Sequence, residues 1–309
     1  MKRRLLILCT WGFWLAIFAQ SPDLGTTSNF SLFTAAGAFT NSGATTVTGD
    51  IGTHVGALTG FPPGSVIGGT FVANPTTAIA ATDVAVAYTS LNGAGTVIGT
   101  TLGNGQTLTA GTYTTGAAST LNGNLILDGQ NNANSQFVIR IGGAFSTSVN
   151  STITLINGAS LCNIYWQIGG AFTLGDNSLF RGTVIASGQI ELLEGSSLIG
   201  RGLTTAGAIL LHNNIVTIPT TPAAIAGPNR TICQNENTQI GAAAVAGNSY
   251  SWTSVPAGFT STTANPTVTP LVSTTYTLVE TITSTGCTNN NSVLVTVNPV
   301  PNTSLIYHF

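Results

Sequence analysis

FVIRIGGAF at Phe137–Phe145 is nearly repeated as IYWQIGGAF at Ile164–Phe172, 27 residues further along the chain. Each copy holds an apolar strand, then Gly-Gly, then the start of a second short strand. The period-two alternation of a strand turns the odd-numbered residues of 137–141 inward and Arg140 outward. A strand–turn–strand unit that returns at a fixed period is typical of chains that wind in stacked coils. The repeat therefore predicts an all-β solenoid, and it favours binding over an extended surface.

A shorter repeat indicates the size of one coil. Phe180–Gly182 returns as Leu198–Gly200, 18 residues later. A coil of this length holds three short strands and three turns, with neighbouring coils about 4.8 Å apart. We therefore expect a triangular β-solenoid over residues 21–218.

One segment departs from the β pattern. Asn74 is a good N-cap and Pro75 suits the first helical position. Apolar residues then recur at helical spacing from Ala80 to Leu91, and Gly93 follows. The pattern predicts one long α-helix over about residues 75–92, packed with its apolar stripe against the first domain.

The N-terminus has the features of a secretory signal peptide. Lys2–Arg4 precede the apolar run Leu5–Phe18, and small residues follow near Ala19. A bilayer span needs about 20 apolar residues, which makes the alternative, an N-terminal anchor, the weaker interpretation. We expect a signal peptide at residues 1–20, no membrane span after its cleavage, and a secreted protein, either extracellular or at the cell surface.

The composition argues against several classes of function. Only 5% of the residues are charged, and the chain after residue 20 keeps four arginines, no lysine and all nine acidic residues. Nucleic-acid binding needs a basic patch that neutralises phosphates, so we expect no such partner. The histidines are scattered, and Glu191 and Glu194 face opposite ways on a strand. We therefore expect no metal, no cofactor, no catalytic residues and no enzyme.

A second domain is predicted after the repeats end. Residues 219–222 have the composition of a linker, and residues 223–299 contain short alternating strands and Trp252. This pattern favours an immunoglobulin-like β-sandwich, followed by a tail at residues 300–309.

The cysteines are expected to reflect an oxidising compartment. Cys9 lies in the signal peptide, and Cys233 and Cys287 both lie in the second domain, where we expect them to form a disulfide. Cys162 is then expected to be a small buried hydrophobic residue.

The order of the motifs resembles the DUF3494 family of microbial ice-binding (antifreeze) proteins over roughly residues 24–218. The motifs that carry the resemblance include Thr48-Gly-Asp-Ile-Gly52, Gly60-Phe-Pro-Pro-Gly64, Leu108-Thr-Ala-Gly-Thr-Tyr113, Cys162-Asn-Ile-Tyr-Trp-Gln167 and Gly200-Arg-Gly-Leu203. The resemblance implies a right-handed, discontinuous β-solenoid with the helix packed alongside, and adsorption to ice through one flat face. The second domain is similar to the PKD-like or immunoglobulin-like modules of secreted bacterial proteins, which implies a spacer or an adhesion module.

The resemblance also implies where ice would bind. Thr109-Ala-Gly-Thr112 matches the family's loose ice-face motif, and the strands that follow each corner would form the flat face: 144–148, 171–175, 189–193 and 208–212. The candidate ice-binding residues are Thr109, Thr112, Ser146, Ser148 and Thr173. Other outward positions depart from a Thr/Ser/Ala pattern, and these are Gln189, Glu191, Leu193, Leu210 and His212.

Three functions remain open at this point. The first is a secreted ice-binding protein that inhibits ice growth or recrystallisation through a flat Thr/Ser/Ala face. The second is a cell-surface adhesion or structural protein that uses the same face to bind an extracellular polymer or another cell. The third, a polysaccharide-degrading enzyme, would need clustered Asp, Lys or Arg, and the chain after residue 20 has no lysine.

Overall fold

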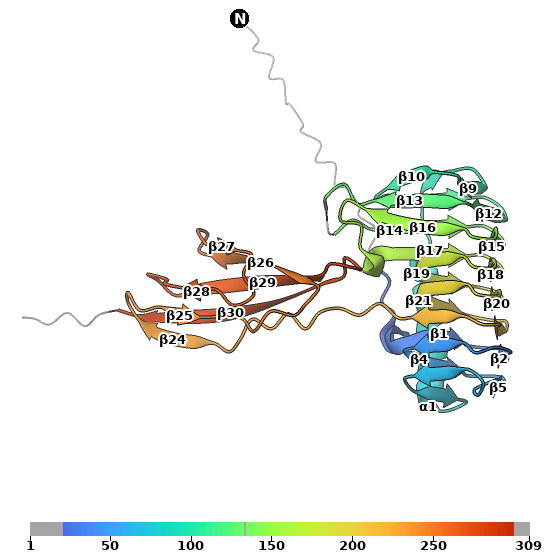
Figure 1. The fold of residues 1–309 in the computed structure, drawn as a ribbon, viewed down its shortest axis with the longest axis horizontal. Coiled ribbons are helices and arrows are strands. Elements are labelled where there is room, and N and C mark those ends of the chain that lie inside the picture. Colours follow the sequence, from blue (N-terminus) through green and yellow to red (C-terminus); the bar gives the residue numbers. More distant parts are fainter. Residues whose placement is uncertain (1–20, 133, 300–309) are drawn as a thin grey trace, which may run out of the picture.

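A stack of parallel strands forms the larger part of the molecule, and a smaller unit extends from one side of it (Figure 1). The computed structural model describes residues 21–132 and 134–299. The predicted signal peptide and the predicted tail at 300–309 lie outside the described residues. No helix in the described part of the chain is long and apolar enough to cross a membrane.

The stack has three faces because a full coil contributes one short strand to each. One face is a separate sheet of eight parallel strands, which we call the eight-stranded sheet. Its strands, in spatial order, are β5 (Leu58–Thr59), β2 (Phe39–Asn41), β22 (Ile209–Leu211), β20 (Ile190–Leu192), β18 (Phe172–Leu174), β15 (Phe145–Thr147), β12 (Ser119–Asn122) and β9 (Thr101–Gly103).

The other two faces belong to one sheet of fifteen strands. The face that we call the helix face consists of β8 (Thr96–Val97), β11 (Gly111–Thr115), β14 (Phe137–Ile141), β17 (Ile164–Ile168), β19 (Leu179–Ala186), β21 (Ser197–Thr204), β1 (Phe30–Thr34), β4 (Asp50–Thr53) and β7 (Thr70–Val72). The third face consists of β10 (Gln106–Thr109), β13 (Asn124–Asp128), β16 (Thr152–Ile156), the first residues of β19 and β21, β23 (Ile215–Thr217), β3 (Thr46–Thr48) and β6 (Ser65–Ile67).

The order of the coils in space differs from their order in the sequence. The coil of β1, β2 and β3 is the first in the sequence, and the coil of β21, β22 and β23 is the last. These two coils pair with each other in the stack. The helix α1 (Pro75–Ser90) connects β7, at one end of the stack, to β8 at the other. The stack is therefore discontinuous in sequence, as the family resemblance implies. Short 3₁₀ turns, η1 (Gly25–Asn29) and η2 (Leu161–Asn163), precede β1 and β17.

The predicted helix is confirmed, and it ends two residues earlier than expected. Asn74 and Thr77 form a capping box, in which Asn74 Oδ1 accepts from Thr77 N at 3.0 Å and Thr77 Oγ1 accepts from Asn74 N at 2.9 Å. Ala80, Val84 and Ala87 are fully buried against the helix face. The helix therefore covers the middle strands of that face, whereas Val97 in β8 and Val72 in β7 stay exposed at its two ends.

Arg140 and Gln167 point out of the stack, as the alternation predicts, yet both are buried because the end of α1 covers them. Arg140 Nη1 donates to Leu91 O at 3.3 Å, and Gln167 Nε2 donates to Tyr88 O at 2.8 Å. These side chains satisfy carbonyl groups that a helix C-terminus leaves without intrahelical partners. Burial lowers the pKa of Arg140, and the negative end of the helix favours a cation at this place.

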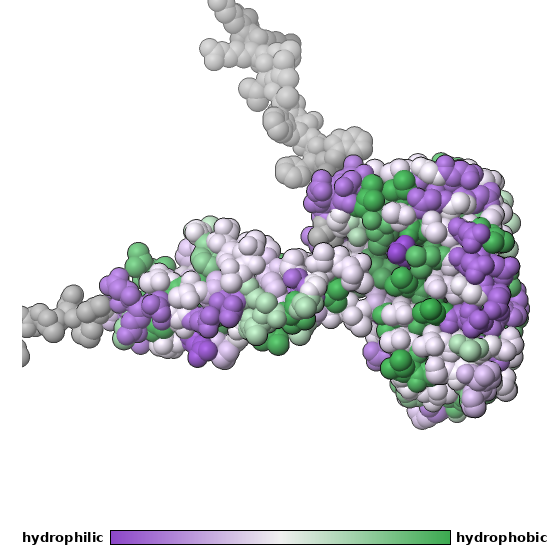
Figure 2. Space-filling view, in the orientation of Figure 1, coloured by the Kyte–Doolittle hydropathy of each residue, from purple (hydrophilic) through white to green (hydrophobic). Residues whose placement is uncertain are grey.

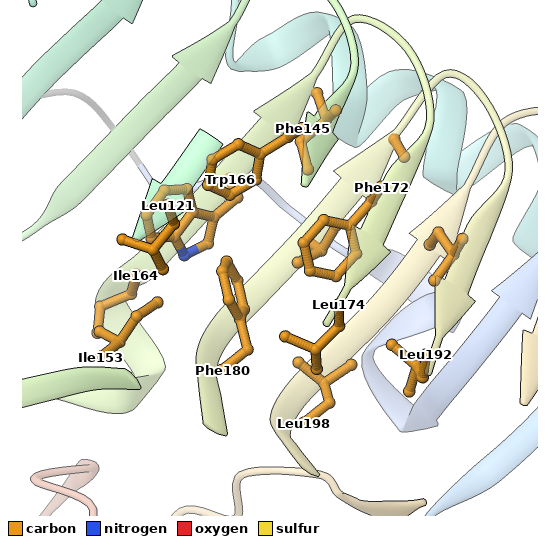
Figure 3. Packing of buried hydrophobic residues seen from close by; sticks show 14 of the residues in the cluster. Leu121, Phe145, Ile153, Ile164, Trp166, Phe172, Leu174, Phe180, Leu192 and Leu198 are labelled. Carbon is orange, nitrogen blue, oxygen red and sulfur yellow. The ribbon is translucent and has the colours of Figure 1, made fainter. Parts of the chain in front are cut away.

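A cluster of aromatic rings lies in the interior of the stack, among buried leucine and isoleucine side chains (Figure 3). Trp166 lies against Phe145 with ring centroids 5.5 Å apart and against Phe180 at 4.9 Å. Phe172 lies 6.0 Å from Phe145 and 5.0 Å from Phe180. The odd-numbered residues of β14 are buried as predicted, with Phe137 at 0% exposure. The two near-copies, residues 137–145 and 164–172, are thus adjacent layers of one core.

The smaller unit contains two sheets that enclose Trp252, which is fully buried. The larger sheet has the order β24 (Arg230–Cys233), β30 (Thr288–Asn298), β29 (Thr274–Ile282), β26 (Asn248–Val255) and β27 (Thr260–Ser261), and the smaller one pairs β25 (Thr238–Gln239) with β28 (Thr267–Val268). Residues 218–229 connect this unit to the stack without a helix or strand. Within this connection, Ala224 N donates to Glu280 Oε2 at 2.7 Å.

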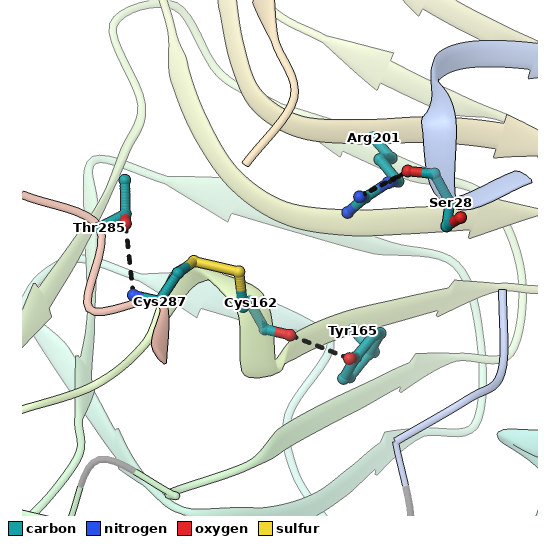
Figure 4. The surroundings of a disulfide bond; sticks show 6 residues. All are labelled: Ser28, Cys162, Tyr165, Arg201, Thr285 and Cys287. Carbon is teal, nitrogen blue, oxygen red and sulfur yellow. Dashed lines mark hydrogen bonds between the residues drawn. A yellow bond between two sulfur atoms is a disulfide. The ribbon is translucent and has the colours of Figure 1, made fainter. Parts of the chain in front are cut away.

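The predicted disulfide between Cys233 and Cys287 is wrong. Cys287 is bonded to Cys162, so a residue of the stack is joined to a residue of the smaller unit, with the Cα atoms 5.4 Å apart (Figure 4). Cys233 pairs with Asn298 at the far end of β30, whereas Cys287 precedes the first residue of that strand. A strand rises about 3.3 Å per residue, so the two cysteines lie about 35 Å apart, and a disulfide needs Cα atoms within about 7 Å.

Cys162 is therefore not the isolated buried residue that we expected, and Cys233 is exposed and free. The contact around the disulfide is extended by Leu161 N, which donates to Thr285 O at 2.8 Å. The smaller unit is tied to the stack at two places, through the connection at 218–229 and through this disulfide.

Candidate binding face

The eight-stranded sheet carries a continuous outward row of side chains, one from each strand. In the central strands the flanking residues turn into the core, for example Phe172 and Leu174, both fully buried, around Thr173. The strand register places the outward residues side by side in the order Thr59, Thr40, Leu210, Glu191, Thr173, Ser146, Thr120 and Thr101. Neighbouring members of such a row are about 4.8 Å apart.

A second row runs beside the first and consists mainly of alanine. Residues two positions earlier in a strand point to the same side. These residues are Ala57, Ala38, Ala208, Gln189, Ala171, Ala144 and Ala118. Their backbones continue the coil-to-coil pairing, since Ala171 O accepts from Phe145 N at 2.8 Å and Ala144 O accepts from Ser119 N at 2.9 Å. Because alanine side chains are short, this part of the sheet surface has little relief.

A shallow trough lies between the two rows at the β9 end of the sheet. It has a volume of about 350 Å³ and spans the four coils of β9, β12, β15 and β18. Its lining holds no charged residue and consists of Thr100, Thr101, Ala118, Ser119, Thr120, Ala144, Phe145, Ser146, Ala171 and Thr173. This part of the face is therefore uncharged, nearly flat and regular from coil to coil.

The coils of β20 and β22 interrupt this regularity with larger polar groups. His212 Nδ1 lies 3.3 Å from Ser42 Oγ, and His212 Nε2 lies 3.4 Å from Glu191 Oε1. Gln189 Nε2 donates to Glu191 Oε2 at 3.4 Å. The side chains of His212 and Glu191 are 37% and 26% exposed, so a carboxylate is held at the sheet surface, in contact with solvent.

The predicted strands of the flat face are brought together by the structure, but the candidate residues are only partly on it. Ser146 and Thr173 are direct neighbours in the outward row. Ser148 is exposed at the edge of the sheet, where its hydroxyl contacts Asn122 Oδ1. Thr109 ends β10 on the third face, and Thr112 lies in β11 on the helix face. The Thr-Ala-Gly-Thr match therefore spans a corner and does not place its two threonines with Ser146 and Thr173.

Sequence reasoning missed Thr101, Thr120, Thr40 and Thr59. A signal for one of them was present, because Gly37–Thr40 reads GAFT and so does Gly170–Thr173. Both segments cross the same corner of the stack and enter the eight-stranded sheet. Extending the repeat to this third copy would have found Thr40.

In the described part of the chain, no group of three or more His, Cys, Asp or Glu side chains is arranged to hold a metal ion. The arginines of the stack lie off the eight-stranded sheet. Burial lowers the pKa of Arg181 on the third face and of Arg201 on the helix face, where the Arg201 guanidinium donates to Ser28 O (Figure 4). The face is thus suited to surface contact through hydroxyl, methyl and backbone groups.

Comparisons with known proteins point to one family. Residues 33–217 match the family described as Ice-binding-like, which covers most of the stack and stops before the smaller unit. An ice-binding protein from Nostoc sp. (strain HG1) is 35% identical over 204 residues, which cover 64% of this chain and 74% of that protein. Ice-binding protein 1 from Shewanella frigidimarina (strain NCIMB 400) is 33% identical over 232 residues, 64% of this chain and 26% of that protein.

Solved structures agree with this match. The ice-binding protein of the Antarctic ascomycete Antarctomyces psychrotrophicus has a TM-score of 0.63 at 34% identity, over 65% of this chain and 100% of that chain. The ice-binding protein of an Antarctic Flavobacteriaceae bacterium has a TM-score of 0.62 at 38% identity, over 70% of this chain and 56% of that chain. With its parallel-strand stack and flanking helix, the chain belongs to the Ice-binding-like family.

Proposed function

We propose that this protein binds ice, and that the eight-stranded sheet is the surface that adsorbs. Family membership supports ice as the partner. The observation that supports this sheet is the outward row with its trough, in which small uncharged side chains repeat at the spacing of the coils. Threonine, serine and alanine present methyl and hydroxyl groups without the strongly held hydration of a charge.

The two other faces of the stack are less suited to a flat, ordered partner. Helix α1 covers the middle strands of the helix face. The third face carries exposed isoleucines, Ile67 at 64% and Ile215 at 58%, together with Arg181. Figure 2 shows apolar side chains gathered on the side of the stack in view, over strands that include β19 and β21, and hydrophilic ones along the edge where the eight-stranded sheet lies.

The position of the smaller unit keeps the proposed face accessible. This unit extends from one side of the stack, and the strands of the eight-stranded sheet lie on the opposite side (Figure 1). The Cys162–Cys287 disulfide fixes this arrangement at a second point. A secreted protein could thus present the sheet to ice while the smaller unit serves as a spacer or adhesion module. The proposal also includes secretion through residues 1–20 and a purely non-enzymatic role. It further includes a right-handed triangular form of the solenoid and an immunoglobulin-like class for residues 223–299.

Crystal shaping and recrystallisation inhibition by the chain from Ser21 test the proposal. Thr120→Tyr places a large ring in the row and should reduce inhibition at equal concentration by about tenfold, as for a central contact of an interface. The control is Thr107→Tyr, the same change at an exposed position of β10 on the third face, which should leave activity unchanged. Absence of ice activity in the unaltered chain, with binding to glycans or cells instead, would overturn the proposal in favour of the adhesion function.

A further inference from the structure

The uncharged array does not run the length of the eight-stranded sheet. Thr101, Thr120, Ser146 and Thr173 occupy four successive coils around the trough, and we call them the first patch. Thr40 and Thr59 occupy the two coils at the other end, beside Ala38 and Ala57, and we call them the second patch. The coils of β20 and β22 lie between the patches and present Glu191 and Leu210 in the outward row.

The width of this interruption follows from the register. Thr173 is separated from Thr40 by three coil steps, through Glu191 and Leu210. At about 4.8 Å a step the two threonines are about 14 Å apart. A layer of ordered water that spans both patches would therefore have to cross these two positions.

Polar contacts hold the Glu191 carboxylate at the surface of the eight-stranded sheet, where an ordered layer of water would have to form. His212 lies at 3.4 Å from one carboxylate oxygen, and Gln189 donates to the other. Ser42 lies 3.3 Å from the second nitrogen of the histidine, so the whole chain of groups is fixed across three coils. Glu194, in the turn that follows β20, accepts from Asn213 Nδ2 at 2.8 Å. A carboxylate binds water strongly, and stripping that water from it is unfavourable.

Leu210 adds a second obstacle of a different kind. It is half-buried and stands between Glu191 and Thr40 in the row, where it has no hydroxyl to match its neighbours. The row beside it is also broken, because Gln189 takes the place that alanine holds in the neighbouring coils. Charge, size and hydrogen-bonding pattern thus change together in two adjacent coils.

We propose that Glu191 and Leu210 divide the face, so that the first patch alone adsorbs to ice and the second patch contributes only when the interruption is removed. The inference rests on the proposed function and assigns its limiting residues. Glu191 and Leu210 then determine how many coils of the sheet contact the ice surface. A longer uninterrupted row would contact ice at more points and bind it more tightly.

A cycle of variants tests this division. In the unaltered chain, Thr120→Tyr should lower recrystallisation inhibition by about tenfold, whereas Thr40→Tyr should change it by less than about twofold. Glu191→Thr combined with Leu210→Thr should raise the activity of the chain at equal concentration by about threefold or more, and Thr40→Tyr should then become harmful in that background. The matched control is Leu179→Thr combined with Ile199→Thr, two outward positions of the third face that should give no gain.

The outcomes separate the two proposals. If the unaltered chain has no ice activity, the proposed function fails and the division fails with it. If Thr40→Tyr is as harmful as Thr120→Tyr in the unaltered chain, or if the double threonine variant gains nothing, the division is wrong while the proposed function stands. Glu191→Gln keeps the size of the side chain and removes its charge, and this variant should give part of the gain even where the double variant unfolds. Circular dichroism melting of each variant identifies loss of fold.

Discussion

Phe172 lies directly beneath the proposed face, because it precedes Thr173 in β18 and turns into the core. Its ring is fully buried and contacts Phe145 of the preceding coil and Phe180 of the next strand, at centroid distances of 6.0 and 5.0 Å (Figure 3). We expect Phe172→Ala to lower the free energy of unfolding of the stack by about 3–5 kcal/mol. Burial of the ring accounts for about 1.5–3 kcal/mol, and each aromatic contact adds about 0.5–1.5 kcal/mol.

Hydrogen exchange of the amides in β15 and β18 measures this loss without a contribution from the smaller unit. Protection that depends on opening of the whole stack should fall by about 150- to 5,000-fold in Phe172→Ala, because about 1.4 kcal/mol corresponds to a factor of ten. Leu210→Ala is the matched control, an outward position of the same sheet that should cost about 1 kcal/mol or less. A fall of less than about tenfold in Phe172→Ala, or one equal to that of the control, would refute the packing argument.

Alkylation of the denatured, unreduced chain from Ser21 should modify one cysteine, Cys233, and a peptide map that shows modified Cys162 would contradict the disulfide. Asn74→Ala removes the acceptor for Thr77 N and should lower stability in urea unfolding by about 0.5–2 kcal/mol, and an unchanged midpoint would argue against the cap. Burial raises the pKa of the Tyr165 hydroxyl, so the stability that it contributes is complete below the tyrosine pKa of the unfolded chain, about 10, and is lost as the pH rises through the folded value. Urea unfolding between about pH 9 and 12 should therefore show a smaller alkaline loss in Tyr165→Phe than in the unaltered chain, and equal losses would contradict this assignment.

Local patterns were sufficient to predict the layers of the fold. The alternation in 137–141 and 164–168 identified adjacent strands of one face, with their apolar residues in the core. The Gly-Gly pairs marked the corner into the eight-stranded sheet. Asn74 and Pro75 marked the start of the only α-helix in the described residues, which covers one face. These features depend on neighbours in sequence, which is why periodicity revealed them.

Features that depend on distant residues could not be predicted in the same way. The sequence of Thr109–Thr112 matches a motif, but a corner at Ala110 sends the two threonines to different faces. The partner of Cys287 depends on how the smaller unit sits against η2, which no spacing between cysteines reports. Likewise, the interruption by Glu191 and Leu210 became a boundary only when the register placed both residues in the row of Thr173.

The coil that contains β21, β22 and β23 joins two groups of coils that are made at different times. The coil that begins at β1 is synthesised about 170 residues before its neighbour, so the pairing edges of β1, β2 and β3 stay open until the last coil has emerged. Open strand edges are the places where chains associate wrongly during folding. A chain that ended before β21 would hold two short stacks with four open ends in place of one stack with two. The first coils therefore bury their pairing edges only when the coil of β21, β22 and β23 has folded onto them. Mutations in that coil should reduce the yield of folded protein by more than their effect on the free energy of unfolding would suggest.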